Sequence, residues 1–207
     1  MRIDLQETAK ILLESDNILL VCHSHPDGDT LGSACALAHA LSEKRKNIRL
    51  ECSDPIPKDF SFMFEGLEIR EFEPELIAAI DVADTKLLGK DSEAKYQNKI
   101  DLCIDHHGSN ILYADKVWLE ADSASTAEMI YILLTAMELE ITPVIASCLF
   151  TGVSTDTGCF RFSNTKTRTF EIAAELTILG ADFYNIIQVF FETKTKTYAA
   201  LERLAMD

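Results

Sequence analysis

Residues 17–33, NILLVCHSHPDGDTLGS, join an apolar run to a polar turn that carries histidine and aspartate. Residues 17–22 are nearly all apolar, which is typical of a strand buried on both faces of a sheet. From residue 32 to residue 46, apolar side chains recur at helical spacing, which predicts a helix. This stretch therefore predicts a strand, a loop and a helix, the first unit of an α/β fold.

The rest of the sequence continues this alternation. Three more short apolar runs predict strands, and four longer segments predict helices. The predicted strands are residues 48–52, 76–80 and 100–104, and the predicted helices are residues 125–139, 143–153, 166–179 and 182–192. Strands that alternate with helices of this length indicate a parallel sheet. We therefore expect an α/β fold, a parallel β-sheet flanked by helices on both faces.

Acidic and imidazole side chains follow the predicted strands. In open parallel sheets, ligands bind beyond the carboxyl ends of the strands, so a site is expected at these positions. The candidates are His23, His25, Asp27 and Asp29 after the first strand, Asp81 and Asp84 after the third, Asp105, His106 and His107 after the fourth, and Asp156 after the apolar segment 148–153. Their convergence on one rim of the sheet is the strongest functional signal in the sequence.

Each of these motifs alone has a simpler interpretation. Residues 27–29 (DGD) suit a turn, Asp81 and Asp84 suit a helix cap, and the histidine pair 106–107 suits a solvated loop. Together, however, so many carboxylates at one place would repel one another strongly. Divalent cations relieve that repulsion, and manganese suits mixed carboxylate and imidazole ligands. The combined pattern therefore predicts a metal site.

The number of donors indicates two metal ions. The six predicted ligands are His23, Asp27, Asp29, Asp81, His106 and Asp156. Two ions about 3.5–4 Å apart, bridged by a carboxylate, are the usual device for in-line phosphoryl displacement. The chain has 19 Lys and Arg against 34 Asp and Glu, a net charge of −15, which would repel a long nucleic acid. The metal ions would allow this acidic protein to hold an anionic substrate.

These residues resemble the DHH phosphoesterase superfamily, whose N-terminal domain has the expected fold. Four motifs carry the resemblance, in the expected order: His23-x-x-x-Asp27-x-Asp29-x-x-Gly32-Ser33, the Asp81 motif, Asp105-His106-His107, and Gly152-x-x-x-Asp156-Thr157-Gly158. Residues 156–165 (DTGCFRFSNT) and 125–128 (STAE) are similar to the bacterial nanoRNase/pAp phosphatase group. The resemblance implies hydrolysis of short oligoribonucleotides (nanoRNA) and of 3′-phosphoadenosine 5′-phosphate (pAp). It also implies two manganese ions, for which magnesium or cobalt could substitute.

The resemblance further implies a role for each residue. One ion would be held by His23, Asp27 and Asp81, and the other by Asp29, Asp81, His106 and Asp156, with Asp81 as the bridge. The catalytic residues would be Asp81, Asp105, which orients an imidazole, and His107, which faces the scissile phosphate. Substrate contacts would come from Arg161, Ser125 and Thr126. A surface ion pair is the alternative for Arg161, and helix capping is the alternative for Ser125 and Thr126.

The family normally has a second domain. We assign residues 1–192 to the catalytic domain and residues 193–207 to the start of a linker helix. A C-terminal substrate-binding domain with a Gly-Gly-Gly-His-type motif is expected after the linker, and the sequence contains no such motif. We therefore expect either a truncated form or a catalytic half that lacks its substrate clamp.

Other features concern location and rival functions. The six cysteines are scattered, and neither a signal peptide nor a membrane-length apolar run occurs, so we expect a cytoplasmic protein without membrane partners. A homodimer is compatible with the sequence. The rival functions are cyclic-dinucleotide phosphodiesterase or pyrophosphatase activity on the same core, and a non-catalytic metal-binding DHH module.

Overall fold

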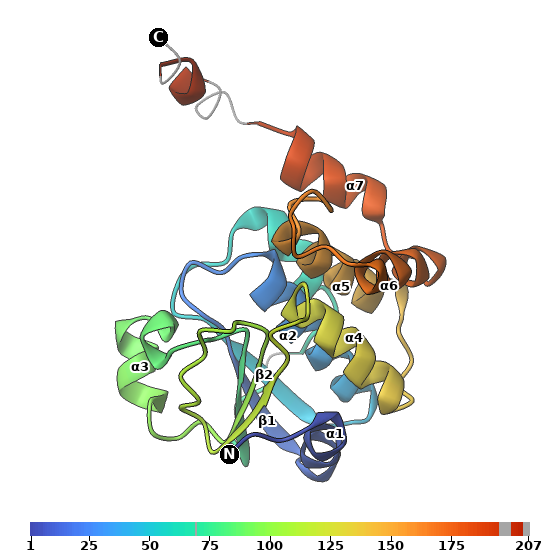
Figure 1. Ribbon diagram of the computed structural model, residues 1–207. Coiled ribbons are helices and arrows are strands. Elements are labelled where there is room, and N and C mark those ends of the chain that lie inside the picture. The colour runs from blue at the N-terminus through green and yellow to red at the C-terminus, as the bar shows by residue number, and fades with distance from the viewer. Residues whose placement is uncertain (69, 195–199, 205–207) are drawn as a thin grey trace.

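The computed structural model describes residues 1–68, 70–194 and 200–204, and its centre is a five-stranded sheet (Figure 1). The strands are β1 (Asn17–Val21), β2 (Asn47–Glu51), β3 (Leu76–Ile80), β4 (Leu102–Asp105) and β5 (Lys116–Leu119). Their spatial order is β2-β1-β3-β4-β5, and every neighbouring pair is parallel. The predicted α/β fold with a parallel sheet is confirmed. Strand β5, of only four residues, was not predicted.

The order of the strands fixes where a ligand would bind. The chain runs from β1 outward to β2, and then returns to the other side of β1 to form β3. The crevice outside the carboxyl ends of β1 and β3 is therefore the topological switch point of the sheet, where open α/β folds bind ligands. His23 follows β1 and Asp81 follows β3, so both residues lie at this crevice.

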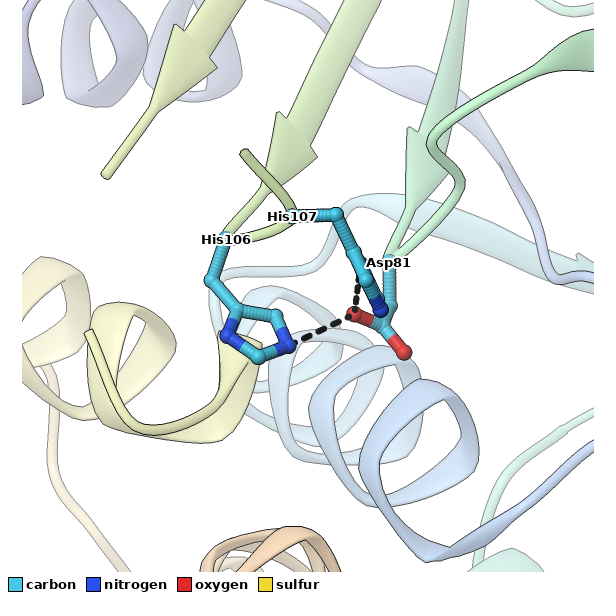
Figure 2. A group of neighbouring side chains, drawn as sticks. All are labelled: Asp81, His106 and His107. Carbon is cyan, nitrogen blue, oxygen red and sulfur yellow. Dashed lines mark ion pairs between the residues drawn. The ribbon is translucent and has the colours of Figure 1, made fainter. Parts of the chain in front are cut away.

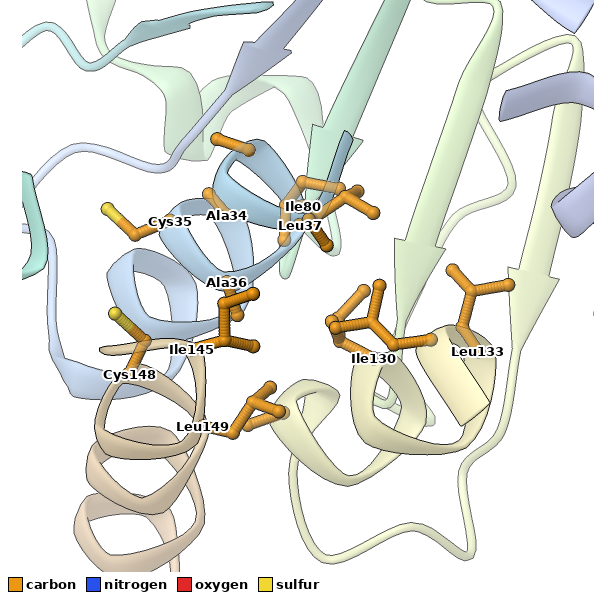
Figure 3. Close-up of a cluster of buried hydrophobic side chains, with 14 of the residues drawn as sticks. Ala34, Cys35, Ala36, Leu37, Ile80, Ile130, Leu133, Ile145, Cys148 and Leu149 are labelled. Carbon is orange, nitrogen blue, oxygen red and sulfur yellow. The ribbon is translucent and has the colours of Figure 1, made fainter. Parts of the chain in front are cut away.

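Helices cover both faces of the sheet, as predicted. They are α1 (Leu5–Glu14), α2 (Gly28–Glu43), α3 (Lys90–Tyr96), α4 (Thr126–Ala136), α5 (Pro143–Asp156), α6 (Thr167–Ile178) and α7 (Phe183–Ile187), with 3₁₀ turns η1 (Lys58–Phe64) and η2 (Thr85–Leu88) and a π-helical turn η3 (Gln188–Glu192). Neither α1 nor α3 was predicted. One face packs against α2, α4 and α5 (Figure 3), and the smaller core on the other face includes Leu88 of η2 and Tyr96 of α3.

Several predicted helix ends differ from the observed ones, and two of these differences concern the site. Helix α2 begins at Gly28 instead of residue 32, because the Asp27 side chain caps it by accepting the N–H groups of Asp29 and Thr30. Helix α5 continues to Asp156 instead of ending at residue 153. The predicted polar loops around residues 27–29 and 154–156 are therefore mostly helix termini.

Glycines allow α2 and α5 to pack with their backbones in close contact. A Cβ atom on Gly32 would lie 2.3 Å from the carbonyl oxygen of Cys148. A Cβ atom on Gly152 would lie 2.6 Å from the Ala127 side chain and 2.9 Å from Oδ1 of Asp29. Because any larger residue would push these helices apart, the two glycines set the position of the Asp29 carboxylate relative to α5.

The C-terminal part of the expected organisation is described only in part. Residues 200–204 are helical, whereas residues 195–199 and 205–207, also assigned to the linker helix, lie outside the described residues. Among the residues that the structure describes, no helix is both long enough and apolar enough to span a membrane.

Candidate metal centre

The predicted ligands converge at the carboxyl ends of β1, β3 and β4. His23 follows β1, Asp81 follows β3, and Asp105 ends β4, directly before His106 and His107; Asp27 and Asp29 lie at the start of α2, and Asp156 is the last residue of α5. Three groups of potential ligand atoms lie within 4.8 Å of one another: His23, Asp27 and Asp81; Asp29, His106 and Asp156; and Asp81, His106 and His107. The first group contains the three predicted ligands of one ion. The second contains three of the four predicted ligands of the other ion and lacks only the shared Asp81.

Asp81 is the central carboxylate. Its Oδ2 atom lies 3.7 Å from Nε2 of His23, and its Oδ1 atom lies 3.8 Å from Nε2 of His106. Figure 2 shows the rings of His106 and His107 turned toward this carboxylate from the end of β4. Asp81 therefore faces both predicted ion positions, as a bridging ligand must.

Two of the three imidazoles present a lone pair to the carboxylates. The Nδ1 atom of His23 lies 2.7 Å from the carbonyl oxygen of Ser24, and Nδ1 of His106 lies 3.2 Å from that of Ser123. A carbonyl oxygen only accepts hydrogen bonds, so Nδ1 is the protonated nitrogen in both neutral rings. The Nε2 atoms are then free to act as metal ligands, the arrangement in which a backbone carbonyl orients a ligating histidine.

The surroundings of these Nε2 atoms favour a positive charge, supplied by a proton or by a metal ion. Nε2 of His106 is buried, has no hydrogen-bond partner among the described residues, and lies 3.4 Å from Oδ2 of Asp156. Nε2 of His23 lies 3.6 Å from Oδ1 of Asp27. A lone pair that faces a carboxylate oxygen is repelled by it, and a divalent cation between the two atoms turns this repulsion into coordination. The donor set therefore fits metal ions.

Three of the carboxylates, those of Asp29, Asp81 and Asp156, have raised pKa values. Burial raises the pKa of Asp29 well above its usual value, and the nearby charges of Asp81 and Asp156 raise it further. Burial likewise raises the pKa of Asp81, and it raises that of Asp156 to about 6 even though His106 opposes the shift. A group of carboxylates with such raised pKa values is poised to exchange protons for cations.

The start of α4 holds two of these carboxylates in place. Oδ2 of Asp29 accepts the backbone N–H of Thr126 at 2.7 Å, and Oδ1 accepts that of Ala127 at 2.8 Å. The Thr126 hydroxyl donates to Oδ1 of Asp81 at 2.7 Å. Ser125 caps α4 by accepting the N–H of Glu128. Both Ser125 and Thr126 are completely buried in this arrangement, and their predicted contact with substrate stays a prediction.

His107 differs from the other two imidazoles. Its Nδ1 atom lies 2.8 Å from Oδ1 of Asp105 instead of facing a backbone carbonyl, and 44% of its side chain is exposed, against 16% for His23 and 11% for His106. The hydrogen bond to Asp105, followed by the charge of Asp81, raises the pKa of His107 to about 9 although burial opposes the shift. A protonated and accessible imidazole beside the carboxylates is suited to stabilise negative charge on a phosphate.

The remaining candidates lie around this centre. Asp84 caps the turn η2 by accepting the N–H of Lys86. It therefore has the capping role that was its simpler interpretation. His25 has a left-handed backbone, and its side chain is 93% exposed. Arg161 is also exposed. It lies in the turn that follows Asp156, where its Nε donates to the carbonyl oxygen of Gly158 at 2.6 Å. Its contact with a substrate phosphate stays a prediction.

The stability of the metal-free protein is expected to fall as pH rises. The pKa of Asp156 is about 6 in the folded chain against 3.8 ordinarily, so between these values the folded chain binds more protons than the unfolded chain. The contribution of His107 to the free energy of unfolding changes in the same direction. It is complete below pH 6.5 and is lost as the pH rises through about 9. The metal-free protein should therefore melt at least about 3 °C higher at pH 5.5 than at pH 8.

Thermal melts of the chelator-treated protein at the two pH values, with and without added manganese, test this expectation. Manganese should raise Tm mainly at pH 8, because protons compete with the metal at pH 5.5. An equal Tm gain at both pH values would contradict the raised pKa values of Asp29, Asp81 and Asp156.

Comparisons with known proteins relate the chain to one family. Residues 17–153 match the DHH family, N-terminal domain. The bifunctional oligoribonuclease and PAP phosphatase NrnA of Bacillus subtilis (strain 168) is 30% identical over 186 residues, which cover 86% of this chain and 58% of that protein. The cyclic-di-AMP phosphodiesterase GdpP of the same organism is 28% identical over 219 residues, which cover 94% of this chain and 32% of that protein. The chain thus spans less than two thirds of either relative.

Among solved structures, an exopolyphosphatase-related protein from Bacteroides fragilis superposes with a TM-score of 0.85 at 24% sequence identity. The match covers 95% of this chain and 62% of that protein. At this level of identity the likeness concerns the fold, and it extends across nearly the whole chain.

Proposed function

The chain belongs to the DHH family. On that premise we propose that it is a phosphoesterase that hydrolyses short oligoribonucleotides, 3′-phosphoadenosine 5′-phosphate, or both, through a dinuclear metal centre. The observation that carries the proposal is the pair of imidazoles, His23 and His106, whose Nε2 atoms face carboxylates that include the shared Asp81. Their Nδ1 atoms face backbone carbonyls, so both rings are held ready to ligate.

The residues of this chain divide the work of such a reaction. His23, Asp27 and Asp81 would hold one manganese ion, and Asp29, Asp81, His106 and Asp156 would hold the other. When bound, two such ions lower the pKa of water and neutralise phosphate charge. His107, protonated and accessible, would donate a hydrogen bond from Nε2 to a phosphate oxygen, while Asp105 holds its Nδ1–H.

Three observations support small nucleotides as substrates. The Bacillus subtilis relative is named as an oligoribonuclease and PAP phosphatase. Residues 156–165 (DTGCFRFSNT) are similar to the signature of the nanoRNase/pAp phosphatase group, and they place the exposed Arg161 near the end of α5. The net charge of −15 disfavours binding of a long nucleic acid.

The test compares four substrates with the purified chain loaded with manganese. The substrates are the dinucleotide pApA, pAp, cyclic di-AMP and pyrophosphate, and bound metal is quantified on the same sample. We expect two metal ions per chain and turnover of pApA or pAp well above that of the other two. Preferential turnover of cyclic di-AMP or of pyrophosphate would replace the proposed substrate class, and absence of bound manganese would contradict the dinuclear centre itself.

A further inference from the structure

Asn110 lies behind the pair formed by Asp105 and His107, away from the metal ligands. Its Nδ2 atom lies 2.6 Å from Oδ2 of Asp105, whose other oxygen, Oδ1, lies 2.8 Å from Nδ1 of His107. Asp105 is completely buried and Asn110 is 9% exposed, so solvent does not compete for these hydrogen bonds. The three side chains form a continuous relay from a buried turn to an accessible imidazole.

The orientation of the Asn110 amide follows from its neighbours. Its Oδ1 atom lies 2.7 Å from the backbone N of Leu112, which only donates, so the oxygen must be on that side. The NH₂ group is then directed at Asp105 and, at 3.3 Å, at the carbonyl oxygen of Val82. The backbone N–H of Asn110 also donates to the carbonyl oxygen of His107 at 3.0 Å. The residue is thus tied to both ends of the 105–107 segment.

These contacts restrict the rotation of the Asp105 carboxylate. The Asn110 donor supplies the side-chain hydrogen bond to Oδ2, whereas Oδ1 accepts both Nδ1–H and the backbone N–H of His107. Without the donor, Oδ2 would be left buried with its hydrogen bond unmade, which costs free energy and frees the carboxylate to turn. The ring of His107 would then lose the fixed acceptor that determines its orientation.

We propose that Asn110 is a positioning residue. By holding the Asp105 carboxylate, it fixes the acceptor of the His107 Nδ1–H. The opposite ring nitrogen of His107, Nε2, is then available to the reacting phosphate. The kinetic part of this inference rests on the proposed function. Because Asn110 is buried and its side chain bonds to Asp105, Val82 and Leu112, none of them a predicted metal ligand, its loss should lower kcat with little change in KM or in bound metal. Loss of a residue that orients a functional group in this way typically costs about 10–100-fold.

The experiment compares Asn110→Ala and Asn110→Asp with a matched control, Tyr113→Phe. The Tyr113 hydroxyl donates to the carbonyl oxygen of Val82 at 2.9 Å, the same oxygen that Asn110 contacts, but Tyr113 does not touch Asp105. Asn110→Asp keeps the acceptor for Leu112 but replaces the NH₂ group, which donates to Asp105 and to Val82, with a carboxylate oxygen. Asn110→Ala serves if the two adjacent carboxylates prevent folding. Both Asn110 variants should lose 10–100-fold in kcat on pApA, while Tyr113→Phe stays within about twofold.

A second measurement does not depend on activity. In the magnesium-loaded chain, the Nδ1–H of His107 should give a downfield proton NMR signal, assigned by its loss in His107→Gln. The signal should persist in Tyr113→Phe and broaden or vanish in the Asn110 variants, because the proton exchanges with water once its acceptor turns. An unchanged signal and unchanged kcat in folded Asn110→Ala would overturn the inference. If the wild-type chain hydrolyses none of the substrates, the proposed function fails, while the NMR signal still tests the role of Asn110.

Discussion

Replacing Asp81 with asparagine is expected to abolish hydrolysis and to remove at least one of the two proposed metal ions while the fold stays intact. Asp81 is the carboxylate that faces both His23 and His106, so its loss affects both predicted ion positions. Asparagine is the suitable replacement because Asp81 has a left-handed backbone with φ of 62°, which asparagine adopts more readily than most residues. Asp81→Ala should also lose activity, with added backbone strain.

The measurements are turnover of pApA, metal content per chain, and Tm with and without manganese. Burial and the charge of Asp27 raise the pKa of Asp81, so a neutral side chain should relieve repulsion in the metal-free protein. We therefore expect metal-free Asp81→Asn to melt at or above the Tm of the metal-free wild type at pH 8, and to gain less from manganese. The control is Asp84→Asn, which alters only the cap of η2. Retained turnover in Asp81→Asn would rule out the bridging role.

Replacing His107 with alanine or glutamine is expected to lower kcat by about 10²–10³ without changing metal content, the range for loss of one donor that stabilises transition-state charge. The prediction separates His107 from His106, although both lie near Asp81. The Nδ1 of His107 is occupied by Asp105, whereas Nε2 of His106 has no partner among the described residues. His106→Ala should accordingly lose metal, and His107→Ala should not.

His25→Ala is the matched control for His107. His25 is an exposed imidazole in the segment between β1 and α2, and its contacts are with Asp54. Its replacement should leave kcat within about twofold, since surface substitutions of this kind have small effects. Loss of bound manganese in His107→Gln would show that His107 is a ligand, and an unchanged kcat would remove it from the reaction.

Much of the fold could be predicted because buried parallel strands are continuous apolar runs. The predicted strand at residues 76–80 (LIAAI) is the observed β3, and all five of its residues are buried. Two missed elements lack this signal: β5 has four residues with a lysine at its start, and six of the seven residues of α3 (KDSEAKY) are polar or Ala. Such elements are placed by packing against the sheet instead of by their own pattern.

The site could be predicted as a set of ligands but not as a set of hydrogen bonds. The histidines and aspartates follow strands whose carboxyl ends meet at one rim, so their convergence follows from the topology. The roles of Thr126 and Asn110 were not predicted. The motif that contains Thr126 also predicts a helix cap, and the short polar segment that contains Asn110 predicts a turn. No local pattern distinguishes an asparagine that orients a carboxylate from one that only forms a turn.

The sequence by itself determined the α/β fold, the parallel sheet and the residue types that meet at its rim, because hydrophobic periodicity and the order of polar residues after strands are local properties of the chain. Only the tertiary structure decided which nitrogen of each imidazole is free and which carboxylates are held together. Those properties depend on hydrogen bonds between distant segments, such as the bond from the Thr126 amide to Asp29, residues 97 positions apart. Such bonds form only once α2, α4 and the sheet have packed.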